Sequence, residues 1–251
     1  MATLAGLQAR TVAAKGGVLD PADVRRAIRP ENIHFPRTGL ICVENTHNRA
    51  SGVCTPLPVM QALAAVAHGA GIPLHVDGAR IFNAAVYLGV AAAQLVADAD
   101  SVQFCLSKGL GAPVGSLLAG NKAFIARARK VRKLLGGTMR QSGIVAAAGI
   151  VALESMIERL AEDHANARRL AEGLAALPGI KVVLQAVQTN IVIFDTSGTG
   201  KTAAELVATV ARDGVLVGAS TPDSIRAVTH KDVDTADIES ALQAFARAVR
   251  S

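Results

Sequence analysis

The strongest constraint on the fold is a pattern that occurs twice, a short apolar strand followed by a charged residue and a glycine. In residues 102–106, apolar side chains alternate with smaller or polar ones, which predicts a strand that leads to Lys108. Residues 73–76 form a second apolar run, and Asp77 stands at its end, before Gly78. Ligand groups project from the carboxyl ends of strands in open α/β sheets. We therefore predict that Asp77 and Lys108 lie at the same edge of one sheet.

A lysine and a carboxylate at such an edge suit the chemistry of pyridoxal phosphate. A lysine amine removed from water loses its proton more easily, and the neutral amine is the nucleophile that forms a Schiff base. A carboxylate at Asp77 can hold the ring N–H of the cofactor, which keeps the ring an electron sink. Each residue also has a simpler interpretation, because most loop lysines are solvated and an Asp before a Gly often forms a turn or an N-cap. Their occurrence on consecutive strand ends favours the cofactor role.

Composition narrows the class of protein. Of the 251 residues, 51% are hydrophobic and only 3% are aromatic, which suits helices packed on a buried sheet. We find no apolar run long enough to span a bilayer and no secretory signal at the start. The three cysteines, Cys42, Cys54 and Cys105, stand far apart without CxxC spacing. The sequence therefore favours a reducing, cytoplasmic location.

The net charge of +6 makes nucleic acid a partner to consider. The densest basic run, residues 127–133, contains no interleaved aromatic residue, so we interpret it as one solvated face of a helix. The surplus positive charge is a better fit for anionic small molecules. We expect a small-molecule substrate, and neither a nucleic acid nor a membrane as partner.

The order of predicted helices and strands indicates two parts. Alternating elements of the first part predict a wound sheet covered on both faces, with strands at 38–44, 73–76, 102–106 and 114–119 and helices at 20–29, 56–69 and 82–87. From residue 121 the sequence is helical, with a long helix or a pair of helices within 140–170. The rest predicts a small α+β domain, with strands at 181–184, 190–194 and 225–229 and helices at 203–213 and 235–249. We predict two domains, residues 1–152 and 153–251.

The segment GTGKT at residues 198–202 has the composition of a phosphate-binding loop. Such a loop needs another glycine five positions before Gly200, and that position is Asp195. We therefore expect a surface turn that precedes a helix.

Two histidines stand near the predicted strand ends. His47 follows a strand end, as Asp77 and Lys108 do, and a neutral imidazole there can take a proton from a substrate hydroxyl or stabilise a turn. His75 lies two residues before Asp77 and is predicted to share its face of the sheet. The other histidines lack the mutual spacing of metal ligands, so we predict no metal site.

Five segments, in order, are similar to motifs of one enzyme family. They are ENTHNR at 44–49, HVDGARIFNA at 75–84, FCLSKGLGAPVGS at 104–116, LGGTMRQSG at 135–143 and IRAVTHKDV at 225–233, and they resemble the low-specificity L-threonine aldolases. The resemblance implies an α/β fold with a fold-type-I pyridoxal-phosphate-dependent transferase-like sheet domain, incomplete at its N-terminus, and a smaller α+β C-terminal domain. It also implies a carbon–carbon lyase that cleaves L-threonine or L-allo-threonine to glycine and acetaldehyde.

The resemblance assigns roles to individual residues. It implies that Lys108 forms the Schiff base with pyridoxal 5′-phosphate and that Asp77 pairs with the pyridine nitrogen. Arg80 would hold the phenolic oxygen of the cofactor or the substrate carboxylate, and Arg226 would clamp that carboxylate as a fork. His47 matches the family histidine near the substrate hydroxyl, whose proton must leave before the Cα–Cβ bond breaks.

The resemblance also implies a neighbouring subunit and a further N-terminal portion. Lys133 and Arg140 match basic residues that approach the cofactor site of a neighbouring subunit, and such families form tetramers built from dimers. Family members carry a further N-terminal portion ahead of the position that matches Met1, with the segment that cups the cofactor phosphate. We expect an aldolase, and the alternatives are a β-eliminating pyridoxal-phosphate lyase of the same fold and an inactive truncated fragment.

Overall fold

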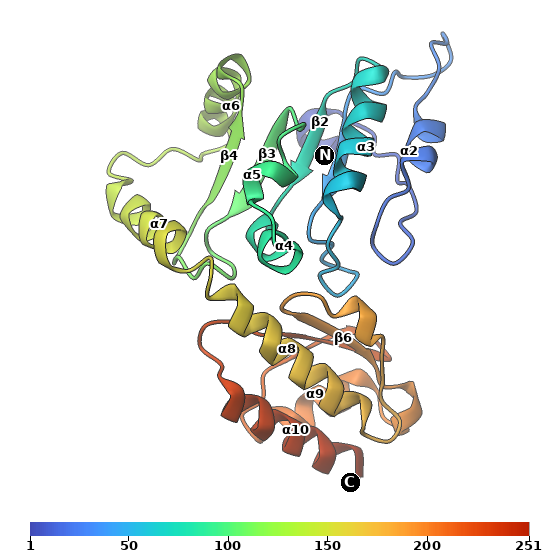
Figure 1. Cartoon of the computed structure of the whole chain (residues 1–251), viewed down its shortest axis with the longest axis vertical. Helices are drawn as coiled ribbons and strands as arrows, with labels where there is room; N and C mark the ends of the chain where they lie inside the picture. Colours follow the sequence, from blue (N-terminus) through green and yellow to red (C-terminus); the bar gives the residue numbers. More distant parts are fainter. Residues whose placement is uncertain (251) are drawn as a thin grey trace.

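The computed structural model describes residues 1–250 and shows two sheets, each with its own helices (Figure 1). The first sheet has the order β1-β2-β3-β4, in which β1 (Ile41–Glu44), β2 (Leu74–Asp77) and β3 (Ser101–Cys105) are parallel and β4 (Ser116–Gly120) is antiparallel to β3. The second sheet is antiparallel, in the order β5 (Lys181–Val182), β6 (Ile191–Asp195), β8 (Ser224–Val228) and β7 (Gly218–Thr221). An α/β part is thus followed by an α+β part, as predicted.

The helices fall into two groups along the chain. The first group is α1 (Ala2–Ala5), α2 (Pro21–Ala27), α3 (Leu57–Gly69), α4 (Ile81–Leu88), α5 (Ala92–Leu95), α6 (Lys122–Leu134) and α7 (Gly143–Ser155). The second is α8 (Leu160–Ala175), α9 (Ala203–Ala211) and α10 (Thr235–Arg250), with 3-10 turns η1 (Leu184–Ala186) and η2 (Ser197–Thr199). None of the helices within residues 1–250 is long and apolar enough to cross a membrane.

Most elements lie where the sequence predicts them, and the differences have local causes. The helical stretch within 140–170 is a pair, because the chain turns after α7 so that Leu160 packs into the apolar cluster around Leu106. The sequence analysis missed α1, α5 and β7. Strand β7 has no apolar alternation to detect, since its four residues are small or polar and all exposed.

Side-chain caps account for several boundaries. The Asp20 carboxylate accepts a hydrogen bond from the Ala22 N–H over 2.8 Å, and Pro21 begins α2. Thr202 and Glu205 form a capping box at the start of α9. The segment 198–202 is therefore a turn before a helix, as predicted.

The two faces of the first sheet differ in chemistry. One face is apolar, and its Val43, Leu74 and Val76 pack with Met60 and Leu63 of α3. The opposite face carries polar and titratable side chains at alternating positions of β1, β2 and β3, namely Cys42, Glu44, His75, Asp77, Ser101 and Gln103. The prediction of a sheet covered on both faces needs correction, because Cys42 and all of β4 are exposed. Polar side chains on that face give little apolar area for a helix to bury.

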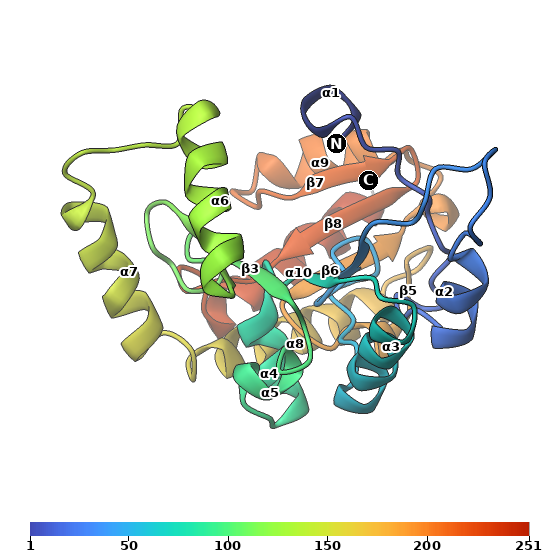
Figure 2. The same ribbon diagram turned by 90° about the horizontal axis from the view of Figure 1, so that it is seen from above.

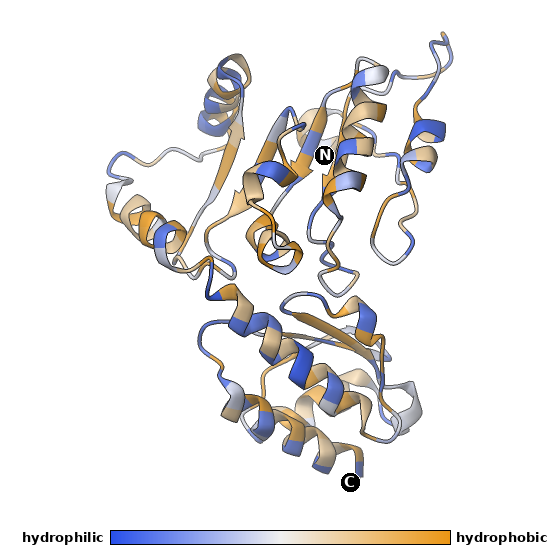
Figure 3. Ribbon diagram, in the orientation of Figure 1, coloured by the Kyte–Doolittle hydropathy of each residue, from blue (hydrophilic) through white to orange (hydrophobic). Residues whose placement is uncertain are grey.

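Large apolar side chains are exposed on β4, α6 and α7. This exposed apolar surface consists of Leu117, Leu118, Leu134, Leu135, Met139, Ile144, Ile150 and Val151. Figure 3 shows apolar colour along β4 and α7, while much of α6 is hydrophilic. The Ile144 residue, for example, is 80% exposed.

The second part has its own core and is tied to the first by several hydrogen bonds. Phe194 and Phe245 lie at its centre with their ring centroids 5.4 Å apart in an edge-to-face arrangement. In one tie, the Asn83 amide of α4 donates to His164 of α8 over 3.1 Å. In another, the Thr189 hydroxyl donates to the carbonyl oxygen of Gly52 over 2.9 Å. The domain boundary at residues 152 and 153 stays a prediction.

Candidate functional site

The candidate site begins at the carboxyl ends of β1, β2 and β3. These strands are adjacent and parallel, and their register pairs Glu44 with Asp77 and Asp77 with Gln103. Lys108 follows three residues after the end of β3. The loops after all three strands leave the same edge of the sheet, and that edge faces the second part of the molecule (Figure 1). The sheet thus brings the segments of Asp77 and Lys108 to one edge.

Asp77 is partly buried, and its hydrogen bonds are one-sided. The Ala79 N–H donates to Oδ1 over 3.1 Å, and the Gln103 amide donates to the same oxygen. Within residues 1–250 both hydrogen bonds of this carboxylate fall on Oδ1, so Oδ2 is left to a ligand. The sequence analysis missed Gln103, although the alternation in the strand places it on the face of Asp77.

His75 lies on the same polar face, as predicted. Its Nδ1 lies 2.8 Å from the Ser101 hydroxyl oxygen. Burial lowers the pKa of His75, and the nearby negative charge of Asp77 opposes that shift. Burial therefore favours the neutral imidazole of His75, two residues before Asp77.

Lys108 lies on a loop whose backbone is tightly packed but whose lysine side chain is exposed. A Cβ at Gly109 would collide with Leu160, and Gly111 has φ +73° with Lys231 against it. The Gly111 N–H donates to the Lys108 carbonyl over 2.9 Å. The prediction that the Lys108 amine is removed from water is therefore wrong for a single copy of this chain. The neighbouring Gly109 and Leu110 are buried, but the lysine side chain is exposed.

Arg80 and Arg226 meet at a residue that the sequence analysis did not single out. Arg80 precedes α4 and Arg226 lies on β8, yet both guanidinium groups donate to Oδ1 of Asn48, over 3.2 Å and 2.9 Å. The Nε atoms of both arginines are buried without a hydrogen-bond partner among the described residues. Asn48 stands directly after His47 within the motif at residues 44–49, but the sequence analysis assigned no role to it.

The electrostatics of this pair favour the binding of an anion. Burial lowers the pKa of Arg80, and the positive charge of Arg226 lowers it further. Burial also lowers the pKa of Arg226. Two guanidinium groups close together and partly removed from water are stabilised by a bound anion. A carboxylate has the two oxygens that such a fork accepts.

His47 lies in the loop between β1 and α3. Its backbone N–H donates to the Val53 carbonyl over 2.9 Å, and its own carbonyl accepts from the N–H groups of Ala50 and Gly52. The ring Nδ1 is buried without a hydrogen-bond partner among the described residues. The loop is thus closed on itself, and the imidazole has an unused nitrogen.

Lys133 and Arg140 lie apart from these residues. Both are exposed, and their side chains make no hydrogen bond or ion pair with another residue of the described range. Lys133 belongs to α6, which packs on β4, the outer strand of the sheet. Figure 2 shows α6 and α7 on one side of the molecule and α2 and α3 on the other.

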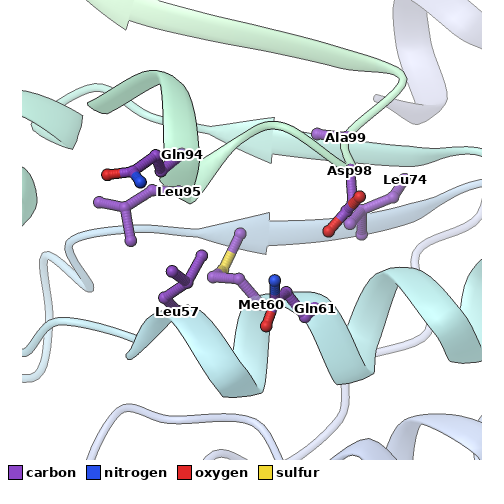
Figure 4. Close-up of a pocket in the computed structure, with 8 residues that line it drawn as sticks. All are labelled: Leu57, Met60, Gln61, Leu74, Gln94, Leu95, Asp98 and Ala99. Atoms are coloured by element: carbon purple, nitrogen blue, oxygen red, sulfur yellow. The ribbon is translucent and has the colours of Figure 1, made fainter. Parts of the chain in front are cut away.

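Two surface hollows lie away from the site. One of about 450 Å³ is lined by residues of α2 and α3, among them Arg25 and Val66. The other is a crevice between α3, β2 and α5, and Met60, Leu74 and Leu95 are among the residues that line it (Figure 4). Leu74 belongs to the apolar face of the sheet, opposite Asp77, so this crevice is a packing seam.

Comparison of the sequence with known proteins identifies relatives over the whole chain. The family described as beta-eliminating lyase matches residues 1–197. Low-specificity L-threonine aldolase 1 of Arabidopsis thaliana is 41% identical over 253 residues, which cover 99% of this chain and 71% of the relative. The low specificity L-threonine aldolase of Escherichia coli K12 is 44% identical over 233 residues, or 92% of this chain and 67% of the relative.

Solved structures show the same fold at low sequence identity. Threonine aldolase of Leishmania major is 18% identical, with a TM-score of 0.73 over 92% of this chain and 67% of that one. Serine palmitoyltransferase of Sphingomonas wittichii is 22% identical, with a TM-score of 0.70 over 92% of this chain and 59% of that one. Aspartate aminotransferase of Thermus thermophilus gives a TM-score of 0.66 at 23% identity, with 93% and 61% covered. The predicted fold class is confirmed.

Proposed function

We propose that this chain, which belongs to the beta-eliminating lyase family and to its low-specificity L-threonine aldolases, cleaves L-threonine or L-allo-threonine to glycine and acetaldehyde. The observation that carries the proposal is the 41% identity to the Arabidopsis aldolase over 99% of the chain. The geometry supports it independently, because an anion fork, a one-sided carboxylate and an unused imidazole nitrogen stand at or beside one sheet edge.

The residues present fit pyridoxal 5′-phosphate as cofactor. Oδ2 of Asp77 is left to accept the ring N–H, and the exposed amine of Lys108 is the nucleophile for the aldehyde carbon. The unpartnered Nε of Arg80 can donate to the phenolic oxygen. When bound, this cofactor supplies a ring that accepts the electron pair released at the substrate Cα. Gln103, by donating to Oδ1 of Asp77, holds the carboxylate in place with Oδ2 left to the ring.

The substrate would be held by its carboxylate between Arg80 and Arg226. A bidentate contact to two guanidinium groups fixes the position of the carboxylate and the orientation of the Cα substituents. His47 would accept the proton of the β-hydroxyl, for which an unprotonated ring nitrogen is required. The closed loop at residues 45–53 would hold the backbone of His47 in place during that transfer.

A homo-oligomer is the assembly that we infer for this chain. The exposed apolar surface on β4, α6 and α7 lacks a partner among the described residues and suits an interface with a second copy. Lys133 and Arg140 lie on this side of the molecule and would reach the cofactor site of the neighbouring copy. A separate apolar cluster on each sheet supports the division at residues 152 and 153, although the cluster of Leu106 and Leu160 crosses it.

The test is product analysis with L-threonine and added cofactor. We expect acetaldehyde and glycine from the wild-type chain, and no product from the Lys108→Ala variant. The matched control is Lys181→Ala, which removes an exposed lysine from β5 and should leave the rate unchanged. The cofactor absorbance band should be lost in Lys108→Ala only.

Two outcomes would contradict the proposal. Pyruvate and ammonia in place of acetaldehyde and glycine would identify a β-eliminating lyase. A chain that binds the cofactor through Lys108 and releases neither pair of products would be an inactive member of the family.

A further inference from the structure

We propose that Asn48 is a positioning residue that holds Arg80 and Arg226 as one fork for the substrate carboxylate. We propose further that its amide, being uncharged, does not neutralise the two guanidinium groups, so that their positive charge remains available to attract the substrate carboxylate. The inference rests on the proposed function for the identity of the substrate, an α-amino acid. It concerns a residue to which the sequence motifs assign no role.

The first step is geometric. Oδ1 of Asn48 accepts from Nη2 of Arg226 over 2.9 Å and from Nη1 of Arg80 over 3.2 Å. Asn48 and Arg226 are 178 residues apart in sequence, and Arg80 lies between β2 and α4 in the first part while Arg226 lies on β8 of the second sheet. One oxygen atom therefore sets the orientation of two guanidinium groups from different parts of the molecule. The two like charges repel each other, and their hydrogen bonds to the shared oxygen oppose that repulsion.

The second step concerns the support of Asn48 itself. Its backbone N–H donates to Oε1 of Glu44 over 3.2 Å, and its neighbour His47 is held by the closed loop. Thr189 and Gln188 of the second part bind the same loop at Gly52 and Cys54. The amide oxygen is therefore presented from a backbone that is tied to both parts, which is what a positioning residue requires.

The third step is electrostatic. An amide oxygen accepts two hydrogen bonds without adding charge, so the fork keeps its two positive charges for a ligand. A carboxylate in place of the amide would keep both hydrogen bonds and strengthen them, yet it would neutralise part of the fork and repel the substrate carboxylate. Aspartate at this position is therefore expected to stabilise the fold at least as well as asparagine, but to weaken binding of the substrate carboxylate.

The experiment compares Asn48→Asp and Asn48→Ala with the wild-type chain. Ligand binding is measured by calorimetry with 3-hydroxybutanoate, which has the carboxylate and β-hydroxyl of threonine but no amine, and with its uncharged amide. We expect Asn48→Asp to weaken binding of the acid by about tenfold to a hundredfold, because its negative charge offsets part of the charge of the fork and repels the carboxylate of the acid. Asn48→Ala should weaken it less, by about threefold to tenfold. The amide should bind all three proteins equally weakly.

Melting temperature, KM and kcat distinguish a positioning role from a merely structural one, because a structural role would make binding and stability fall together. We expect Asn48→Asp to melt no lower than wild type and Asn48→Ala to melt lower. For aldolase activity, both variants should raise KM in the same order as the binding losses, with kcat within about twofold. Asn32→Asp, which makes the same charge change at an exposed residue away from the site, is the control and should match wild type.

The two proposals fail in distinguishable ways. If Asn48→Asp binds the acid as tightly as wild type, or if wild type itself does not bind it, the role of Asn48 is overturned whatever the activity. If the binding order holds but no acetaldehyde is formed from threonine, the anion fork stands and the aldolase proposal fails. If Asn48→Asp does not fold, loss of acid binding by a folded Asn48→Ala supports the proposal, and unchanged binding by that variant overturns it.

Discussion

Acid is expected to weaken the fold through His164, which joins the two parts of the molecule. The Asn83 amide of α4 donates to His164 Nε2 over 3.1 Å, so that nitrogen carries no proton. Burial lowers the pKa of His164 to about 4, from an ordinary value of 6.5. Between these two values the unfolded chain binds a proton that the folded protein excludes. Stability therefore falls as the pH falls through this range.

The size of the effect follows from the two pKa values. With a pKa of about 4 in the folded state and 6.5 in the unfolded state, the free energy of unfolding should decrease by about 2 kcal/mol between pH 7.5 and pH 5. The loss should level off at about 3 kcal/mol below pH 4, where the histidine is protonated in both states. Above pH 6.5 the stabilising effect is fully present.

The assay is urea unfolding of wild type and His164→Gln at pH 7.5 and pH 5. Glutamine does not titrate, and its side-chain oxygen can accept from the Asn83 amide, so the variant should lose about 2 kcal/mol less than wild type on acidification. The control is His34→Gln at an exposed histidine, which should follow wild type. Equal acid sensitivity of wild type and His164→Gln would refute the reasoning and would mean that the Asn83 amide turns its oxygen toward a protonated ring.

Two further predictions, tested by three substitutions, concern the packing of the second part and its tie to the site. Arg159→Ala leaves the fully buried carboxylate of Asp163 without its ion pair, and we expect a loss of about 3–5 kcal/mol in urea unfolding. Arg168→Ala, which breaks an exposed pair of the same spacing, should cost less than about 1 kcal/mol, and an equal cost would contradict the distinction. Gly52→Ala combines a φ of +72° with a collision against Thr189, and we expect a loss of about 2 kcal/mol or more together with weaker carboxylate binding. Wild-type stability of Gly52→Ala would show that the loop does not depend on this contact.

The sheet edge could be predicted from sequence because it depends on local patterns. Apolar alternation locates β2 and β3, and the residue after each strand must lie at the carboxyl edge of a parallel sheet. Asp77 and Lys108 needed no tertiary information beyond the adjacency of these two strands. The exposure of the Lys108 side chain could not be predicted, because it depends on which other segments cover the loop.

The anion fork lay beyond local patterns. Arg80 and Arg226 are each visible as charged residues near a predicted strand, but their meeting at Asn48 depends on how the second sheet docks onto the first. Docking of this kind is decided by side-chain contacts between residues far apart in the chain, such as Thr189 with Gly52. No spacing in the sequence encodes that distance. Family motifs identified the two arginines, and only the structure identified the atom that they share.

The division of the fork between two parts of the molecule links substrate binding to their docking. A carboxylate that bridges Arg80 and Arg226 binds only when the second sheet is docked on the first, so the ligand stabilises the docked arrangement by mass action. The same docking depends on the hydrogen bond between Asn83 and His164. Contacts remote from the site therefore contribute to substrate affinity, because they hold in place one half of the group that binds the substrate.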